Sequence, residues 1–265
     1  MRHRLAPILL ALCILLGPSC RGGRSKTDLT LAGSTSIQPF ADKWAEVFME
    51  AHPDFGVNVQ GGGSSAGIQA CKSGACEIGM SSRELKGDEK DLTEIVIARD
   101  GLAIIVHPSN PVRGSKLAEV KQIFAGDLEN WTYLKGADRS ITVVTREEGS
   151  GTRGAFQELV MGKTRIFRGA ITEDSNGTVR EIVAHDPYAI GFISLGLVNE
   201  QVRALELDGA VANEENIAAG RYKLVRPFLF VSRGEPKGLA KEFVAFVLSA
   251  EGQALIKKEG LLPVK

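Results

Sequence analysis

The sequence has no excess of charge of either sign, since 32 lysine and arginine residues balance 32 aspartate and glutamate residues. Proteins that bind nucleic acid along their surface need a basic excess to neutralise phosphates. The composition therefore excludes this broad class. Any site for an anion must be local, built from a few residues.

The apolar run nearest the N-terminus, residues 5–16, is too short to cross a membrane, because a spanning helix needs roughly 20 residues. It follows Arg2 and Arg4 and precedes Gly-Pro-Ser-Cys at 17–20, which is the order of an export signal. We therefore expect residues 1–20 to be a signal peptide. The alternative is a buried first strand.

Cys20 ends this segment in a way that resembles the bacterial lipobox, in which the cysteine is lipidated and becomes the first mature residue. Leu16 lies one place further from Cys20 than the usual leucine, and Pro18 is unusual there. We expect a lipid anchor at Cys20, with an unlipidated secreted form as the alternative. The polar, glycine-rich residues 21–27 predict a tether.

Cysteine is scarce, with four residues in the chain. Cys13 would leave with the signal and Cys20 would carry lipid, so that Cys71 and Cys76 remain. In an exported protein such a pair favours a disulfide, and two reduced thiols are the alternative. No histidine lies near the pair in sequence, so it gives little support to a metal site.

Three segments repeat one pattern, in which a short strand leads through small residues into a helix. The strands are expected at 28–32, 57–60 and 141–144. A fourth strand near 77–80 runs into Ser81, Ser82 and Arg83. Such loops gather backbone N–H groups at the carboxyl ends of the strands of an α/β sheet. Helices are expected at 37–50, 117–124 and 178–184, with one or two at 239–259. The run at 95–107 predicts one or two strands, and single strands are expected at 189–194 and 226–231.

The third loop contains the residues best suited to hold an oxyanion. Arg146 lies four residues before Ser150, Gly151 and Thr152. A guanidinium supplies charge and a fork of donors, and the Ser-Gly-Thr turn supplies hydroxyls and backbone N–H groups. A plain capped helix is the alternative interpretation.

From residue 29 to 265 the chain resembles the periplasmic phosphate-binding proteins of ABC importers, the PstS family. The resemblance rests on the motifs at 32–36, 61–67, 78–83, 146–152 and 188–192. It implies a type 2 periplasmic-binding fold, with two α/β lobes joined by two hinge strands. We expect residues 28–108 and 227–265 to form lobe I and residues 109–226 to form lobe II.

The resemblance also implies the ligand set for inorganic phosphate, with no cofactor and no metal. The implied phosphate-binding residues are Thr35, Ser36, Ser64, Ser82, Arg146, Ser150, Gly151 and Thr152. Ser34 would support the first loop. Glu148 matches a carboxylate that, in the family, pairs with the arginine.

Position 82 departs from the family, because the best-known members have an aspartate there that accepts the proton of the bound phosphate. Ser82 can accept such a bond, but it repels a fully ionised oxyanion such as sulfate much less. Arg83 is expected either as a second positive group or in a salt bridge across the cleft.

We therefore expect an exported, monomeric solute-binding protein that captures phosphate and delivers it to the membrane subunits of an ABC importer. Binding of sulfate or molybdate and a role as a phosphate-sensing surface protein remain as alternatives. An enzyme such as a phosphatase is disfavoured, because the serines have no partnered histidine or aspartate to activate them.

Overall fold

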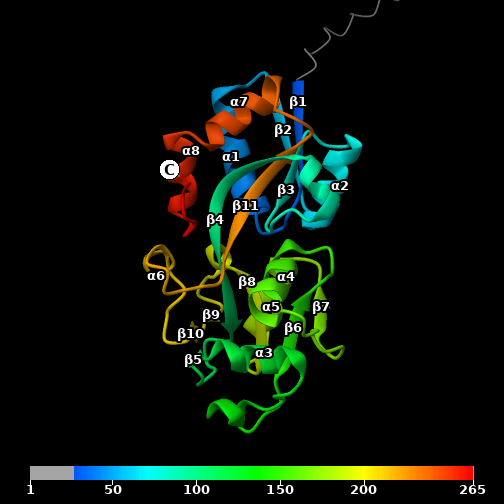
Figure 1. The fold of residues 1–265 in the computed structure, drawn as a ribbon. Coiled ribbons are helices and arrows are strands. Elements are labelled where there is room, and N and C mark those ends of the chain that lie inside the picture. The colour runs from blue at the N-terminus through cyan, green and yellow to red at the C-terminus, as the bar shows by residue number, and fades with distance from the viewer. Residues whose placement is uncertain (1–26, 265) are drawn as a thin grey trace, which may run out of the picture.

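The structure, a computed structural model, describes residues 27–264. The predicted signal peptide, the predicted lipid anchor at Cys20 and the tether up to Lys26 lie outside the described residues. Figure 1 shows an upper and a lower α/β part joined by two long strands. The predicted fold class, two α/β lobes with two connecting strands, is confirmed.

The upper part contains both ends of the described chain. Its elements are β1 (Thr27–Gly33), α1 (Gln38–Ala51), β2 (Phe55–Gln60), α2 (Ser64–Ser73), β3 (Ile78–Ser81), η1 (Gly87–Asp91), α7 (Gly238–Val247) and α8 (Ala250–Lys257). The indole of Trp44 on α1 donates to the carbonyl oxygen of Gly252 on α8 (2.7 Å), so the C-terminal helix packs back on the first lobe. The lobe is therefore discontinuous in sequence.

The lower part is built from the sequence between the two connecting strands. Its elements are β5 (Gly114–Ser115), α3 (Leu117–Ala125), η2 (Trp131–Leu134), β6 (Thr142–Arg146), α4 (Gly151–Phe156), η3 (Gln157–Met161), β7 (Ile171–Glu173), α5 (Asn176–His185), β8 (Ala189–Ser194), η4 (Leu195–Leu197), β9 (Arg203–Ala204), β10 (Glu206–Leu207) and α6 (Glu214–Ala218).

The connecting strands are β4 (Thr93–Val106) and β11 (Val225–Ser232). The sheet runs in the order β2-β1-β3-β11-β4-β8-β6-β7. Strands β1 to β3 are parallel to one another, as are β6 to β8, whereas β11 is antiparallel to β3 and β4. β4 therefore belongs to both halves: it pairs with β11 up to Gly101 and with β8 from Leu102.

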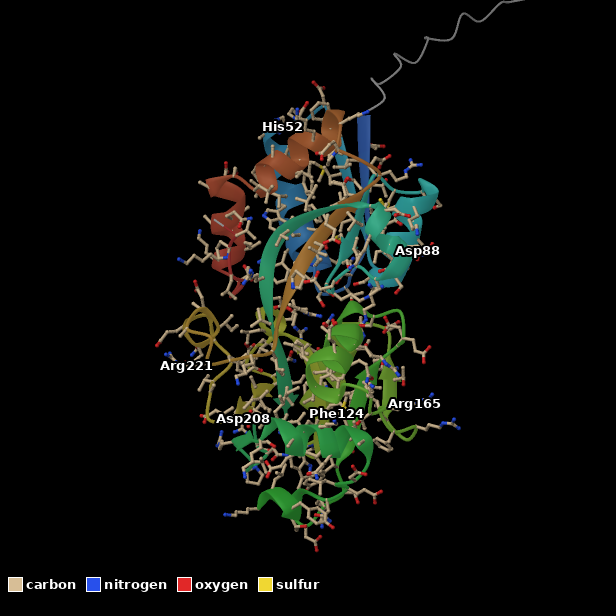
Figure 2. The ribbon with its side chains drawn as sticks, in the orientation of Figure 1. His52, Asp88, Phe124, Arg165, Asp208 and Arg221 are labelled. Atoms are coloured by element: carbon tan, nitrogen blue, oxygen red, sulfur yellow. The ribbon has the colours of Figure 1, made fainter. Side chains whose placement is uncertain are left out.

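Each half has its own hydrophobic core. Ile97 of β4 and Phe228 of β11 pack with the upper cluster around Trp44, whereas Leu102 and Ile104 pack with the lower cluster, which includes Phe124 (Figures 1 and 2). Strand pairing and packing both change from the upper to the lower part within β4. The lobe boundaries themselves stay a prediction.

The expected disulfide is absent, because Cys71 and Cys76 are buried free thiols in the structure. The Cys71 thiol donates to the carbonyl oxygen of Val231 (3.4 Å), and the Cys76 thiol points to that of Gly67 (4.0 Å). Both are packed into the apolar layer between α2 and the sheet, where a small reduced thiol behaves as an apolar side chain. The reduced alternative is the one found.

Candidate functional site

The candidate site lies where the loops after β1, β2 and β3 meet the loops after β6 and β7. Gly33 ends β1 with φ of 137°, and a Cβ atom there would lie 2.4 Å from the carbonyl oxygen of Met80. Glycine therefore lets the end of β1 lie directly against β3, where the Ser34 N–H donates to the same carbonyl (3.0 Å). This close approach brings the first loop to Ser82.

Buried hydroxyls of the first lobe form a connected network. The Ser34 hydroxyl donates to the Ser82 Oγ (2.9 Å) and accepts from the Ser36 N–H (3.2 Å). The Ser64 Oγ accepts from the Ser82 N–H (3.1 Å). All four side chains are almost fully buried. Three of the predicted ligands, and Ser34 as their support, are therefore assembled in one place.

The second lobe brings the Ser-Gly-Thr turn against these hydroxyls. Ser150 caps α4 by accepting from the Arg153 N–H (3.2 Å), and Thr152 and Ser36 share a hydrogen bond of 2.8 Å. A Cβ atom on Gly151 would lie 2.1 Å from the Ser64 Oγ and 2.5 Å from the Ser82 Oγ. The two lobes are thus in contact at the predicted ligands.

Arg146 ends β6 with its side chain 1% exposed. Its Nη2 donates to the Thr35 hydroxyl (3.3 Å) and to the carbonyl oxygen of Asp174 (2.8 Å). Its Nη1 is buried and has no hydrogen-bond partner within residues 27–264. Burial lowers the pKa of Arg146, a shift that the neighbouring Glu147 opposes, and an arginine stays cationic throughout the ordinary pH range.

The carboxylate that pairs with Arg146 is that of Glu147, not that of Glu148. Both Glu147 oxygens accept from the guanidinium, at 3.0 and 3.1 Å. The chain turns directly after β6, with the Ser150 N–H bonded to the Glu147 carbonyl oxygen (3.1 Å), and this turn points Glu148 outward. Glu148 instead lines a cavity of about 590 Å³ together with Lys86 and Arg153. The role implied for Glu148 is therefore wrong.

Arg83 makes an ion pair within its own lobe and not across the cleft. Its guanidinium binds both Glu89 oxygens, at 2.7 and 2.9 Å, and donates to the Ser65 hydroxyl (3.2 Å). The Arg83–Glu89 contact holds the pKa of Glu89 below its usual value. Arg83 is therefore paired with Glu89 of η1 in its own lobe. The salt bridge expected between the lobes is not formed.

Asn176, the first residue of α5, is a site residue that the sequence analysis did not identify. Its amide Nδ2 donates to the Thr35 hydroxyl (3.1 Å) and to the Ser36 hydroxyl (3.0 Å). The signal in the sequence was weak, because the preceding strand β7 has only three residues, two of them exposed. Because β7 was not recognised, the strand-loop-helix unit formed by β7, the following loop and α5 was not recognised either.

Arg226 on β11 and Asp100 on β4 form a second buried ion pair beneath the site, at 2.8 Å. The Arg226 Nη2 also donates to the Ser36 hydroxyl (3.0 Å), and the Ser194 hydroxyl donates to Asp100 (2.8 Å). Burial raises the pKa of Asp100, and the charge of Arg226 opposes this shift. The sequence did contain one sign that Arg226 belongs to the site, because it is a charged residue in an otherwise apolar predicted strand.

Metal-binding clusters and membrane-spanning helices are both absent from residues 27–264. Between residues 27 and 264, no three His, Cys, Asp or Glu side chains are grouped so that they could hold a metal ion. Over the same range, every helix is too short or too polar to cross a membrane.

Comparison with known proteins identifies the family. Residues 21–251 match the family model described as PBP superfamily domain. The phosphate-binding protein PstS of Bacillus subtilis (strain 168) is 37% identical over 247 residues, which are 91% of this chain and 82% of the relative.

Two solved structures are also similar. A putative phosphate ABC transporter substrate-binding protein of Clostridium perfringens, solved with bound phosphate, is 41% identical, with a TM-score of 0.87 over 90% of this chain and 100% of that one. An ABC-type phosphate transport receptor of Vibrio cholerae is 38% identical, with a TM-score of 0.74 over 88% and 99%. These proteins are named for binding and transport, not for catalysis. The chain belongs to the PBP superfamily and, within it, to the PstS family of phosphate-binding proteins.

Proposed function

We propose that this protein captures inorganic phosphate between its two lobes. The observation that carries the proposal is the Arg146 Nη1, a buried cationic donor with no partner in the described part of the chain, on a guanidinium whose Nη2 donates to the Thr35 hydroxyl. A buried dianion is tolerated only where many oriented donors replace its water. The phosphate bound in the Clostridium perfringens relative supports the same ligand.

Phosphate would then pass to the membrane subunits of an ABC importer, the context named for two of the relatives. The donors come from both lobes, so the ligand stabilises the closed form that these subunits would recognise. Export by the residue 1–20 signal, anchoring through lipid at Cys20 and action as a monomer complete the proposal. No cofactor is required.

Calorimetry with inorganic phosphate tests this function. Arg146→Ala should abolish measurable phosphate binding and the associated rise in melting temperature, because it removes the guanidinium whose unpaired buried donor lies at the site. Arg221→Ala is the matched control, since Arg221 is exposed and pairs with Glu215 beside α6, away from α4 and β7 (Figure 2). Unchanged phosphate binding in Arg146→Ala would refute the site.

The second candidate for the ligand is another oxyanion, sulfate or molybdate. The reason is the serine at position 82. The Ser82 side chain is fully buried and offers a hydroxyl where the best-known members of the family have a carboxylate. Titrations with phosphate, sulfate and molybdate at two pH values separate the candidates. Sulfate binding tighter than phosphate binding would overturn the proposal. Co-purification with the importer's membrane subunits separates transport from a sensing role.

A further inference from the structure

Asn176 presents its amide to the site in a single orientation. Its Oδ1 accepts from the backbone N–H of Ser194 (3.2 Å), so its Nδ2 must face the opposite way. Both Nδ2 hydrogens are used, one on the Thr35 hydroxyl and one on the Ser36 hydroxyl. The side chain is 1% exposed. An amide nitrogen can only donate, so these two contacts have a fixed direction.

A hydroxyl oxygen has two acceptor positions and one hydrogen of its own. The Thr35 Oγ1 accepts from Asn176 (3.1 Å) and from the Arg146 Nη2 (3.3 Å), and neither partner can act as an acceptor. Both acceptor positions are therefore filled. The Thr35 hydroxyl is left with only its hydrogen to offer to a ligand.

Ser36 is saturated in the same way. Its Oγ accepts from Asn176 (3.0 Å) and from the Arg226 Nη2 (3.0 Å). In its 2.8 Å contact with Thr152, Ser36 must therefore be the donor. Among residues 27–264, Asn176 alone donates to both hydroxyls, and Arg146 and Arg226 each donate to one of them.

We propose that Asn176 is a positioning residue that fixes the hydroxyls of Thr35 and Ser36 as obligate donors. The inference rests on the proposed function and deepens it. Thr35 then offers its hydrogen to a ligand directly, whereas Ser36 donates its hydrogen to Thr152, which leaves the Thr152 hydrogen for the ligand. Such donors favour oxyanion faces without a proton and disfavour a protonated one.

The proton of monohydrogen phosphate must then face another group. The Ser82 Oγ accepts from Ser34 (2.9 Å) and shares a contact of 3.4 Å with the Ser64 Oγ, and it retains an acceptor position for this proton when it is the donor to Ser64.

A double-mutant cycle tests whether Asn176 acts through the two hydroxyls. Asn176→Ala should weaken phosphate binding about tenfold in the wild-type background, on the scale of one or two lost hydrogen bonds. In the Thr35→Val/Ser36→Ala background, the same substitution should change the phosphate Kd by less than about twofold, because there is no hydroxyl left to orient. Additive effects in the two backgrounds would overturn the proposal.

The pH dependence of phosphate binding is a second test, because a purely structural role of Asn176 would leave it unchanged. Asp at position 176 accepts where Asn donates, so Asn176→Asp should turn the two hydroxyls toward itself and shift optimal phosphate binding to lower pH, where the ligand carries more protons. An unshifted profile would contradict the proposal. Asn58→Asp, on the exposed face of β2, is the matched control.

Two further measurements show whether a negative result refutes the proposed function or only the role of Asn176. A wild-type protein that does not bind phosphate would refute the proposed function and this inference together. Wild-type binding with an additive cycle would refute only the role of Asn176. Melting curves without phosphate identify variants that fail to fold, and for these the conservative Asn176→Ser variant, measured in both backgrounds, decides the cycle.

Discussion

A hydroxyl and a carboxylate offer different groups to a bound oxyanion. A serine can donate or accept, whereas an ionised carboxylate can only accept and repels an anion that carries no proton. Ser82→Asp should therefore raise the ratio of phosphate affinity to sulfate affinity by at least about tenfold, which corresponds to about 1.4 kcal/mol of repulsion between the carboxylate and sulfate. Calorimetry with both anions measures the ratio.

The control for this substitution is Ser140→Asp, which adds the same charge at an exposed position in the lower lobe. Ser82→Ala tests the converse: phosphate affinity should fall while sulfate affinity holds, because only phosphate has a proton to donate. If the ratio stays within about twofold in Ser82→Asp, selectivity does not depend on position 82.

Glu89 gives a pH-dependent prediction in the first lobe. Its pKa is lowered by Arg83, so its contribution to stability is present above the unfolded-state pKa and is lost as pH falls through the folded-state pKa. Glu89→Gln should lower the free energy of unfolding at neutral pH by about 1 kcal/mol, a value reduced for screening because the carboxylate is partly exposed.

Urea unfolding at neutral and at acid pH measures this difference. In acid the variant and the wild type should converge, because the wild-type carboxylate is then protonated. Glu84→Gln, at an exposed neighbouring position, controls for loss of charge. A stability difference that persists in acid would show that the Arg83–Glu89 ion pair is not its cause.

Single residues could be predicted from the sequence where the motif fixed both the type and the place of the side chain. Arg146, Ser36 and Thr152 lie together as expected, because short loops at strand ends leave little freedom. Glu147 was missed because a turn, not the strand alternation, decides which of two adjacent carboxylates faces the arginine. Arg226 was missed because its partner Asp100 is 126 residues away in sequence.

At the scale of elements, α4 reaches the first lobe through a residue without a side chain. A methyl group at Gly151 would overlap the buried hydroxyls of Ser64 and Ser82, at 2.1 and 2.5 Å. Gly151→Ala should therefore prevent the close approach of the lobes and weaken phosphate binding at least about tenfold. The melting temperature without phosphate should change little, because neither core contains Gly151.

Gly177→Ala on α5 is the matched control, because its added methyl would meet only the Ser175 hydroxyl, at 3.7 Å. Calorimetry and thermal melting of both variants make the comparison. Equal phosphate affinity in Gly151→Ala and wild type would mean that α4 does not contact the first lobe in the bound form.

The observed helices and strands lie close to their predicted positions wherever the apolar periodicity of the sequence is strong. Helix α1 and strands β1, β2 and β6 lie where the pattern predicts them, because each buries a continuous apolar face. The run at 95–107 allowed one strand or two, and it forms the single strand β4. Strand β7 was not expected, because its three residues pair at the edge of the sheet and bury little apolar surface.

At the scale of the whole molecule, the two lobes meet at the connecting strands and at the site between them, and Leu197 of η4 also packs against the upper cluster. The Arg226–Asp100 pair joins β11 to β4 where these strands pass from one core to the other, and both side chains are about fully buried. The pair therefore connects the strands that join the lobes with the Ser36 hydroxyl of the proposed phosphate site.

Arg226→Met tests these two roles separately. The single substitution should lower the free energy of unfolding by about 3–5 kcal/mol, because it leaves the Asp100 carboxylate buried without its partner. Asp100→Asn/Arg226→Met should recover most of this loss, since no uncompensated charge remains. Phosphate affinity should stay reduced in both variants, because the Ser36 Oγ has lost one of its two fixed donors. Urea unfolding and calorimetry on the same preparations decide the outcome: if affinity recovers together with stability in the double variant, Arg226 supports the fold and does not act on the ligand site.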